Sequence, residues 1–248
     1  MDKEVLDRIK RVSKAPNVIS GSTPVISFGD FTQASVVTLS INPSSKEFLR
    51  GSDLIPLGKK RLVDFEILGK SHDEKITDND ADRIWKGCKD YFLPTSNPYQ
   101  WFDDLESILK MSDISYKSGT ASHLDLVQSA TFPAWRALPL NVQRQLLKED
   151  YEFFKYQVSY PRISAILING RQVFEVAKMT PGFNLEIKER IEIKSGERTI
   201  PTHIFRGVGP NNKLVFGWTG TLKSLQISAD ERNSLYSKLG DRLQSFLS

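Results

Sequence analysis

The stretch VVTLSINPSSKEF, residues 36–48, decides how this chain is interpreted. It begins as an almost continuously apolar run, which is typical of a strand covered on both faces of a parallel sheet. The run ends at Asn42-Pro43, and two serines follow. An Asn-Pro pair is an ordinary turn signal. The alternative is that Asn42 is held at the mouth of a pocket, where its amide takes part in chemistry.

Further apolar runs and helical patterns follow along the chain. Strands are predicted at SVVTLSI (35–41), SHLDLVQ (122–128), ISAILING (163–170) and KLVFGW (213–218). Residues 183–207 alternate and turn at Ser195-Gly196, which predicts a hairpin attached to the core sheet. Helical patterns cover residues 78–92, which open on an Asp cap, 100–110, 141–157, which open at Asn141, and 171–179. A last helix follows the capping box SADE at 228–231.

Strands that alternate with helices predict an α/β fold. We expect a three-layer α/β/α arrangement with a central four-stranded, mainly parallel sheet and a hairpin insertion, in one domain over residues 1–248. In such sheets ligands bind at the carboxyl ends of the strands. The segments that follow the four strands are NPSS, QSATFPAW, NGR and GWTGTLKS, all small, polar or aromatic. The sequence therefore predicts a site at that edge.

The composition argues against a membrane-spanning protein, a secreted protein and a protein held together by cysteines. No apolar run reaches the ~20 residues that a membrane span needs, and the charged N-terminal segment lacks the apolar core of a secretory signal. Cys88 is the single cysteine, so neither an internal disulfide framework nor a cysteine-based zinc site is expected. A cytoplasmic location is the default expectation. The net charge of +4 permits contact with phosphates without requiring it.

Three segments together resemble a known family. SINPS at 40–44 resembles the first active-site motif of the uracil-DNA glycosylase superfamily, and most closely the mismatch-specific branch, whose motif reads G-I-N-P-G. HLDLVQSATFP at 123–133 is similar to the second-strand motif, and AILINGRQV at 165–173 to the third strand and its turn. The resemblance covers most of the chain in order, and the first motif is its sharpest part.

The chain departs from the family pattern at several positions. Ser40 and Ser44 stand where the first motif carries glycines, and the fourth motif, usually His-Pro-Ser or Asn-Pro-Ser, corresponds to GWTGTLKS at 217–224. None of the three histidines of the chain lies there, which puts a histidine-assisted mechanism in doubt. The mismatch-specific branch also works without that histidine.

The resemblance implies hydrolysis of the bond between a base and its sugar after the nucleotide has been flipped out of the stack. Asn42 would then be catalytic, because its carbonyl oxygen can orient the attacking water although an amide is no base. Pro43 would fix the backbone. Lys46 is interpreted as a phosphate contact or a solvated residue, so the enzyme is expected to be monofunctional and to need no metal or organic cofactor.

Asp125 falls inside a predicted strand, where aspartate is disfavoured by propensity and by the cost of burial. One reading makes it a structural partner of His123 or an arginine. The other makes it catalytic and base-binding, in the place where uracil-specific relatives carry an asparagine. An ionised aspartate only accepts hydrogen bonds, which suits the amino group of cytosine better than uracil. Both readings stay open at this point.

Further residues are assigned to the site through the resemblance. The base-binding set is Ile41, Phe48, Trp101, Asp125 and Asn169. The DNA-binding set is Ser44, Ser45, Lys46, Arg171, Trp218, Thr219, Gly220 and Lys223. Core packing is the alternative for each aromatic residue, including Trp135, which follows the second strand. Arg50, Lys59, Lys60 and Arg61 form a basic cluster that is either a phosphate-tracking surface or a solvated loop.

The expected activity is that of a DNA glycosylase acting on a modified or damaged base, for example the glucosylated hydroxymethylcytosine of phage DNA, in an antiphage role. The expected partner is DNA, duplex or single-stranded, bound by a monomer and without a membrane. Three alternatives stay open: a repair glycosylase for uracil or thymine mismatches, a non-catalytic DNA-binding module on the same fold, and a hydrolase of free nucleosides.

Overall fold

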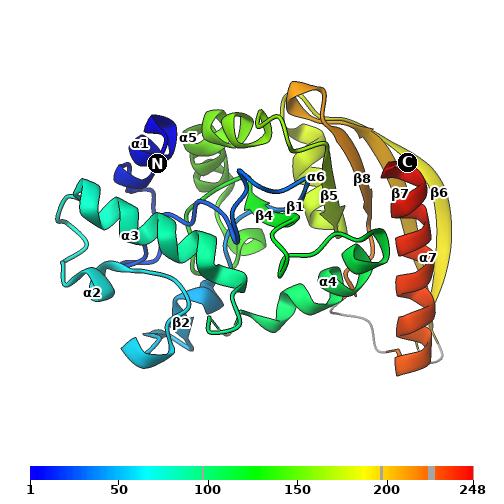
Figure 1. Ribbon diagram of the computed structural model, residues 1–248, viewed down its shortest axis with the longest axis horizontal. Coiled ribbons are helices and arrows are strands. Elements are labelled where there is room, and N and C mark those ends of the chain that lie inside the picture. The colour runs from blue at the N-terminus through cyan, green and yellow to red at the C-terminus, as the bar shows by residue number, and fades with distance from the viewer. Residues whose placement is uncertain (97, 196–197, 223–226, 248) are drawn as a thin grey trace. The chain divides into compact units, whose positions relative to one another are not determined.

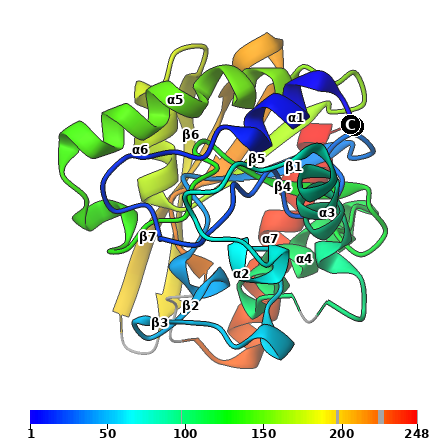
Figure 2. The same ribbon diagram turned by 90° about the vertical axis from the view of Figure 1, so that its left-hand side faces the viewer.

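The computed structural model describes residues 1–96, 98–195, 198–222 and 227–247, and its elements are drawn in Figures 1 and 2. Six strands form one mixed sheet in the order β4-β1-β5-β8-β7-β6. The pairs β1–β5 and β5–β8 are parallel, whereas β8–β7 and β7–β6 are antiparallel. The strands are β1 (Val36–Ser40), β4 (Ala121–Asp125), β5 (Ala165–Asn169), β6 (Asn184–Ser195), β7 (Arg198–Val208) and β8 (Leu214–Trp218). The predicted α/β class is confirmed.

All four predicted core strands are present, and so is the hairpin. The sheet has six strands because β7 pairs with β8, so the hairpin extends the sheet beyond the four predicted strands. Its predicted turn at Ser195-Gly196 falls partly outside the described residues. The second core strand is shorter than predicted, since it ends at Asp125 and not at residue 128. Asp125 therefore stands at the carboxyl end of its strand and not in the middle.

Seven α-helices are described alongside these strands. They are α1 (Lys3–Lys10), α2 (Phe65–Leu68), α3 (Asp78–Lys89), α4 (Asp103–Leu109), α5 (Leu140–Val158), α6 (Arg171–Met179) and α7 (Ala229–Leu247). Outside the main sheet, β2 (Leu49–Arg50) pairs with β3 (Asp53–Leu54). The helix predicted over 100–110 begins as a 3-10 turn, Gln100–Phe102, before α4. None of the helices that the structure describes is long and apolar enough to cross a membrane.

Capping boxes begin two of these helices. At α7, the Ser228 N–H donates to Glu231 at 2.8 Å and the Glu231 N–H to the Ser228 hydroxyl at 3.2 Å, so the predicted box is confirmed. At α3, the cap is Thr77 and not an aspartate: the Asp80 N–H donates to the Thr77 hydroxyl at 3.3 Å, and the Asp80 carboxylate accepts from the Thr77 N–H at 2.9 Å.

Backbone contacts divide the chain into two compact units. The first unit consists of Met1–Phe31, Ser40–Pro98 and His123–Gln157. The second consists of Thr32–Leu39, Tyr99–Ser122 and Val158–Ser248. The expected single domain over residues 1–248 stays a prediction.

In the second unit, α6 and α7 cover opposite faces of the sheet. Phe174 of α6 packs on Phe205 of β7, with ring centroids 4.4 Å apart. Phe216 of β8 packs on Phe246 of α7 at 5.4 Å. Phe205 pairs across the ladder with Gly217, the neighbour of Phe216, so the Phe205 and Phe216 rings point to opposite sides. The sheet here is buried on both faces.

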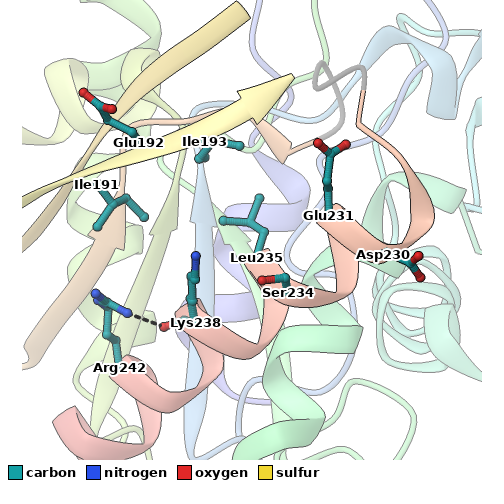
Figure 3. A pocket seen from close by; sticks show the side chains of 9 residues that line it. All are labelled: Ile191, Glu192, Ile193, Asp230, Glu231, Ser234, Leu235, Lys238 and Arg242. Atoms are coloured by element: carbon teal, nitrogen blue, oxygen red, sulfur yellow. Dashed lines mark hydrogen bonds between the residues drawn. The ribbon is translucent and has the colours of Figure 1, made fainter. Parts of the chain in front are cut away.

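Residues of β6 and α7 together line a surface hollow (Figure 3). Ile191, Ile193 and Leu235 give it an apolar floor, and charged side chains of both signs surround them. Two charged side chains of the lining are already bonded within the protein. Arg242 pairs with Glu189 at 2.9 Å, and Glu231 forms part of the N-terminal cap of α7.

Candidate functional site: the turn after β1 and the end of β4

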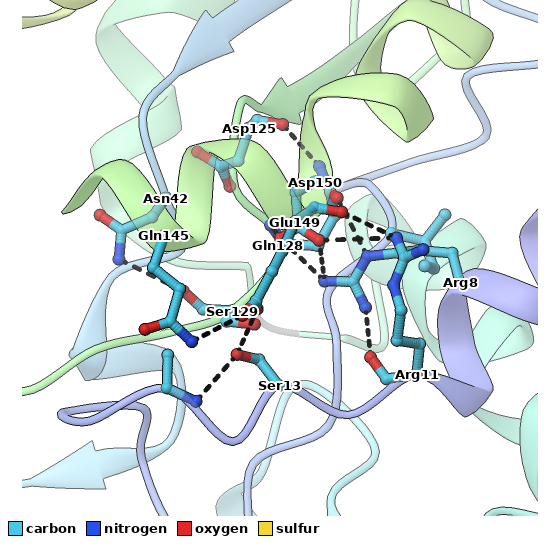
Figure 4. Close-up of polar contacts among 12 residues, drawn as sticks. Arg8, Arg11, Ser13, Asn42, Asp125, Gln128, Ser129, Gln145, Glu149 and Asp150 are labelled. Carbon is cyan, nitrogen blue, oxygen red and sulfur yellow. Dashed lines mark hydrogen bonds and ion pairs between the residues drawn. The ribbon is translucent and has the colours of Figure 1, made fainter. Parts of the chain in front are cut away.

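The side-chain amide of Asn42 is fixed by hydrogen bonds within the first unit (Figure 4). Its Nδ2 group donates to the Thr131 hydroxyl at 3.0 Å and, at 3.4 Å, to the backbone carbonyl of Ser129. A carbonyl only accepts, so the Nδ2 group must face Ser129 and the Oδ1 atom must point the other way. In the described part of the chain, no hydrogen bond reaches Oδ1, and Asn42 is only half-buried. This oxygen is available to a water or a ligand.

Backbone hydrogen bonds bring the segments after β1 and β4 side by side. The Leu126 N–H donates to the Ser40 carbonyl at 3.1 Å, and the Val127 N–H to the Ile41 carbonyl at 2.9 Å. Asn42 and Asp125 therefore flank two adjacent backbone segments that leave the sheet together. The sequence predicted that these segments share an edge, and the structure confirms that neighbourhood.

Asp125 is buried with one carboxylate oxygen unsatisfied. Its side chain is 2% exposed, and His123 Nε2 lies 3.7 Å from Oδ1, too far for a hydrogen bond. Among the residues that the structure describes, Oδ1 has no hydrogen-bond partner. Burial raises the pKa of Asp125 above its ordinary value of 3.8, with His123 opposing that shift. The ion pair with His123 fits the structural role of Asp125, and the unsatisfied Oδ1 atom fits the base-binding role, so both predictions stand.

A second buried carboxylate, Glu47, belongs to the same stretch, and the sequence analysis did not single it out. Arg61 Nε donates to its Oε2 at 2.8 Å, and the Tyr91 hydroxyl to its Oε1 at 2.9 Å. Burial raises the pKa of Glu47, Arg61 lowers it, and the charge of Asp125 raises it further. Arg61 and Tyr91 are remote in sequence, so only the position of Glu47 beside the Asn-Pro turn could have drawn attention to it.

A buried ion pair holds the segment after β4 in place (Figure 4). Arg8 of α1 pairs with Asp150 of α5 at 2.8 Å, and both side chains are 1% exposed. Arg8 Nε also donates to the Gln128 side chain at 3.2 Å, and the Gln128 N–H donates to Asp150 at 2.8 Å. Gln128 Nε2 in turn donates to the Asp125 carbonyl at 2.8 Å. The pair thereby fixes the backbone on which Asp125 stands.

The other predicted residues of the first unit divide between core and surface. Ile41 and Phe48 are buried, with 5% and 2% exposure, so Phe48 packs in the core and presents no open face to a flipped base. Ser44 caps the short 3-10 turn Ser45–Glu47, its hydroxyl accepting from the Lys46 N–H at 3.2 Å. Ser44 and Lys46 are exposed beside Asn42, as a phosphate contact requires.

A basic hollow lies next to this turn. Its lining residues are Lys46, Leu49, Arg50, Gly51, Ile55, Pro56, Gly58, Lys59, Lys60, Arg61, Thr95 and Ser96. The four cations predicted to cluster here do so, and Lys46 joins them. The lining contains no carboxylate.

Within the second unit, the predicted residues stand at the carboxyl ends of β5 and β8. Asn169 ends β5, and the exposed Arg171 begins α6. Trp101, in the 3-10 turn before α4, is half-buried against Phe102 with ring centroids 5.0 Å apart. Lys223 lies outside the described residues.

Trp218, Thr219 and Gly220 are buried, which corrects their assignment to a DNA-binding surface. Trp218 is 0% exposed and is the last residue of β8, which lies between β5 and β7 in the sheet. The Thr219 hydroxyl accepts from the His203 N–H at 2.9 Å, and a Cβ on Gly220 would lie 2.6 Å from the Thr202 hydroxyl. These residues close the core and are not placed to contact a duplex. Trp135 is also buried, at 5% exposure.

Five buried polar atoms of the second unit lack hydrogen-bond partners among the described residues: Asp104 Oδ2, Ser112 Oγ, Asn169 Oδ1, Thr202 Oγ1 and Trp218 Nε1. Asn169 and Trp218 are paired in register at the ends of their strands. Unsatisfied buried polar atoms are rare, and a bound ligand or water is one explanation for them. Asn169 and Trp218 stand at the carboxyl ends of parallel strands, where ligands of α/β sheets bind.

Comparison of the chain with models of known protein families and with curated proteins found no match. In the part of the chain that the structure describes, no group of three or more His, Cys, Asp or Glu side chains is arranged to hold a metal ion. The function of the chain is therefore inferred from the geometry of the site.

Proposed function

We propose that the chain is a monofunctional DNA glycosylase of the uracil-DNA glycosylase superfamily, with the three-layer fold of that superfamily extended by the β6–β7 hairpin. The observation that carries the proposal is the amide of Asn42. Its N–H side is bonded to Thr131 and Ser129, so its carbonyl oxygen is held in one direction and has capacity for a hydrogen bond from water.

The reaction is hydrolysis of the bond between the base nitrogen and the sugar carbon. A water bonded to Asn42 Oδ1 is oriented so that its oxygen attacks the sugar carbon, while the base leaves with the electron pair of the broken bond. Asn42 takes no proton, since an amide is not basic, and the proton of the water passes to solvent or to the departing base. Positioning of a reactant in this way lowers the barrier without any covalent step by the protein.

Asp125 is proposed to read the base edge with its unsatisfied carboxyl group. Because burial raises its pKa, the neutral form is favoured more than in an exposed carboxyl. A neutral carboxyl donates its O–H to N3 of cytosine and accepts from the amino group at position four. It can equally donate to O4 of uracil and accept from N3–H. The ionised form only accepts and therefore repels O4 of uracil.

The proposed substrate is a cytosine-type base with a 5-substituent, such as the glucosylated hydroxymethylcytosine of phage DNA, because ordinary cytosine must be spared. A uracil or thymine mismatch substrate is the second candidate, and the neutral form of Asp125 favours it, since that form also pairs with uracil. A non-catalytic DNA-binding module is the rival from another class, which the basic hollow beside Asn42 favours.

The test is incubation of the protein with labelled duplexes that contain uracil, a thymine mismatch, or a modified cytosine, followed by alkali. Cleavage at the base position reports an abasic site, and Asn42→Ala is the matched control for contaminating glycosylases. Excision by wild type and not by Asn42→Ala supports the proposal. Binding of the duplexes without excision of any base would favour the non-catalytic module, and activity on free nucleosides alone would favour the nucleoside hydrolase.

A further inference from the structure

Two hollows on the protein differ in charge. The hollow between β6 and α7 mixes Asp230 and Glu231 with Lys238, so its charges compensate one another (Figure 3). The basic hollow beside the Asn-Pro turn is lined by five cations and no carboxylate. A concave surface with one sign of charge concentrates counterions of the other sign. The basic hollow is therefore suited to an anion.

Two of its cations are paired with carboxylates that are not among the lining residues. Arg61 Nε is bonded to Glu47 at 2.8 Å, and its NH2 group donates to the Lys46 carbonyl at 2.5 Å. Lys60 pairs with Asp64 at 2.5 Å and also with Glu66, and its side chain is 3% exposed. These contacts make Lys60 and Arg61 a rigid basic floor, and they use up much of the charge of both residues.

The cations at the rim, unlike Lys60 and Arg61, are not paired with carboxylates in the described part of the chain. Arg50 and Lys59 are exposed, and no salt bridge is found for either within the described ranges of the chain. Gly58, which precedes Lys59, also lines the hollow, and a Cβ built on it meets no atom within 4 Å. The rim is therefore open, and its charge is not neutralised by the protein itself.

We propose that this hollow binds a backbone phosphate of DNA, next to the nucleotide that the Asn42 turn engages. The inference rests on the proposed function for the identity of the anion, and on the charge of the hollow for its location. Lys46 belongs both to the hollow and to the turn that carries Asn42, so a phosphate held here fixes the strand close to the reacting nucleotide. Arg50 and Lys59 supply exposed donors at the rim, and Arg61 supplies the one held by Glu47.

Gly58 offers a sharp test, because it lines the hollow and a Cβ there meets no atom within 4 Å. Gly58→Glu places a negative charge in the hollow, and Gly58→Gln has the same size without the charge. Binding of an undamaged duplex is measured by fluorescence anisotropy across a salt series, with thermal melting to verify that both variants fold. We expect Gly58→Glu to weaken binding roughly fivefold or more at low salt, and to lower the slope of log K against log salt by about 0.9 for each phosphate that is no longer neutralised.

A second pair of variants keeps the test independent of the glycine. Lys59→Gln in the hollow should weaken binding and lower the salt slope, whereas Arg144→Gln, which removes an exposed cation of α5, should change neither. Equal affinities for Gly58→Glu and Gly58→Gln would overturn the inference, as would an unchanged slope in Lys59→Gln. Inorganic phosphate is also added as a competitor, with a second DNA-binding protein that lacks such a basic hollow as the control. Loss of DNA binding at phosphate concentrations that do not affect the control would reassign the hollow to a free phosphate ligand.

The two proposals fail separately. If wild type excises a base and Gly58→Glu binds the duplex normally, the hollow is not a DNA site while the glycosylase assignment stands. If Gly58→Glu loses binding to undamaged DNA and no substrate base is ever excised, the hollow is a DNA site on a non-catalytic module.

Discussion

The amide nitrogen of Asn42 donates to the hydroxyl of Thr131 at 3.0 Å, and this bond decides which way the amide faces. Ser129 adds a second, longer bond to the same nitrogen. Because only the N–H side of Asn42 is bonded to residues that the structure describes, its carbonyl oxygen can accept a hydrogen bond from water or a ligand. Substitutions of Asn42 and of Thr131 therefore test the mechanism most directly.

Asn42→Ala removes the oxygen that is proposed to orient water. We expect the variant to fold and to bind DNA as wild type does, and to lose roughly 10²-fold or more in the single-turnover rate of base excision, the scale of losing a positioning group. Rapid-quench measurement at saturating enzyme checks the rate, and circular dichroism checks the fold. Undiminished excision by a well-folded variant would remove Asn42 from the mechanism.

Thr131→Val tests the positioning itself, because it deletes the acceptor while leaving Asn42 in place. A net hydrogen bond is worth about 0.5–1.5 kcal/mol, so the excision rate should fall by about two- to tenfold, less than for Asn42→Ala. Thr180→Val is the matched control, since the Thr180 hydroxyl donates to the Val176 carbonyl at 2.8 Å in the other unit. A loss of rate in both variants alike would indicate a general effect of the hydroxyl-to-methyl change.

Asp125→Asn should change how stability depends on pH. The folded-state pKa of Asp125 is raised above its ordinary value of 3.8, so the native state disfavours the ionised form. Below pH 3.8 both states are protonated and the variant gains nothing from this effect. As pH rises through the folded-state pKa, wild type loses stability that the neutral asparagine keeps. The melting temperature of the variant relative to wild type should therefore rise from pH 4 to pH 8.

The opposite sign is expected for Asp80→Asn, which serves as the control. The bond from Lys70 and those from Thr77 lower the pKa of Asp80 to about 2, so its ionised form stabilises the native state. This variant should melt below wild type at neutral pH, with the difference shrinking as pH falls toward 2. Parallel pH trends for both variants would show that burial of Asp125 is not the cause.

The same carboxyl group should make the choice of base depend on pH. If Asp125 faces the flipped base as proposed, its neutral form can pair with cytosine-type bases and with uracil, whereas its ionised form is repelled by O4 of uracil. The ratio of cytosine-type to uracil excision by wild type should rise as pH increases through the folded-state pKa of Asp125. In Asp125→Asn the ratio should stay flat and favour uracil more than wild type does at high pH. A ratio that follows the same curve in both proteins would make Asp125 a structural residue.

Arg8→Met should destabilise the protein by about 3–5 kcal/mol, because it leaves the buried Asp150 with the more distant cation Arg11, 3.9 Å away, in place of Arg8. Chemical denaturation measures this loss, and Lys10→Met is the matched control. Lys10 pairs with Asp78 on the surface, where the two side chains are 36% and 75% exposed, so its removal should cost no more than about 1 kcal/mol. Equal effects of the two substitutions would show that the Arg8–Asp150 pair does not support the fold.

The local features of the fold could be predicted from the sequence. The short, nearly continuous apolar runs predicted β1 and β5, since strands covered on both faces of a parallel sheet typically carry such runs. The Ser228–Glu231 box determined where α7 begins, because both of its hydrogen bonds lie within four consecutive residues. The Asn-Pro turn also followed from neighbouring residues alone.

The tertiary structure decided what the sequence could not. Trp218 and Phe48 resembled site aromatics, yet burial places both in the core. Arg61 and Tyr91 hold the carboxylate of Glu47 by hydrogen bonds. Thr131, 89 residues further along the chain, fixes the amide of Asn42. Local patterns fix elements because their hydrogen bonds close within a few residues. A polar side chain acquires a direction and a shifted pKa only when distant segments surround it and exclude water.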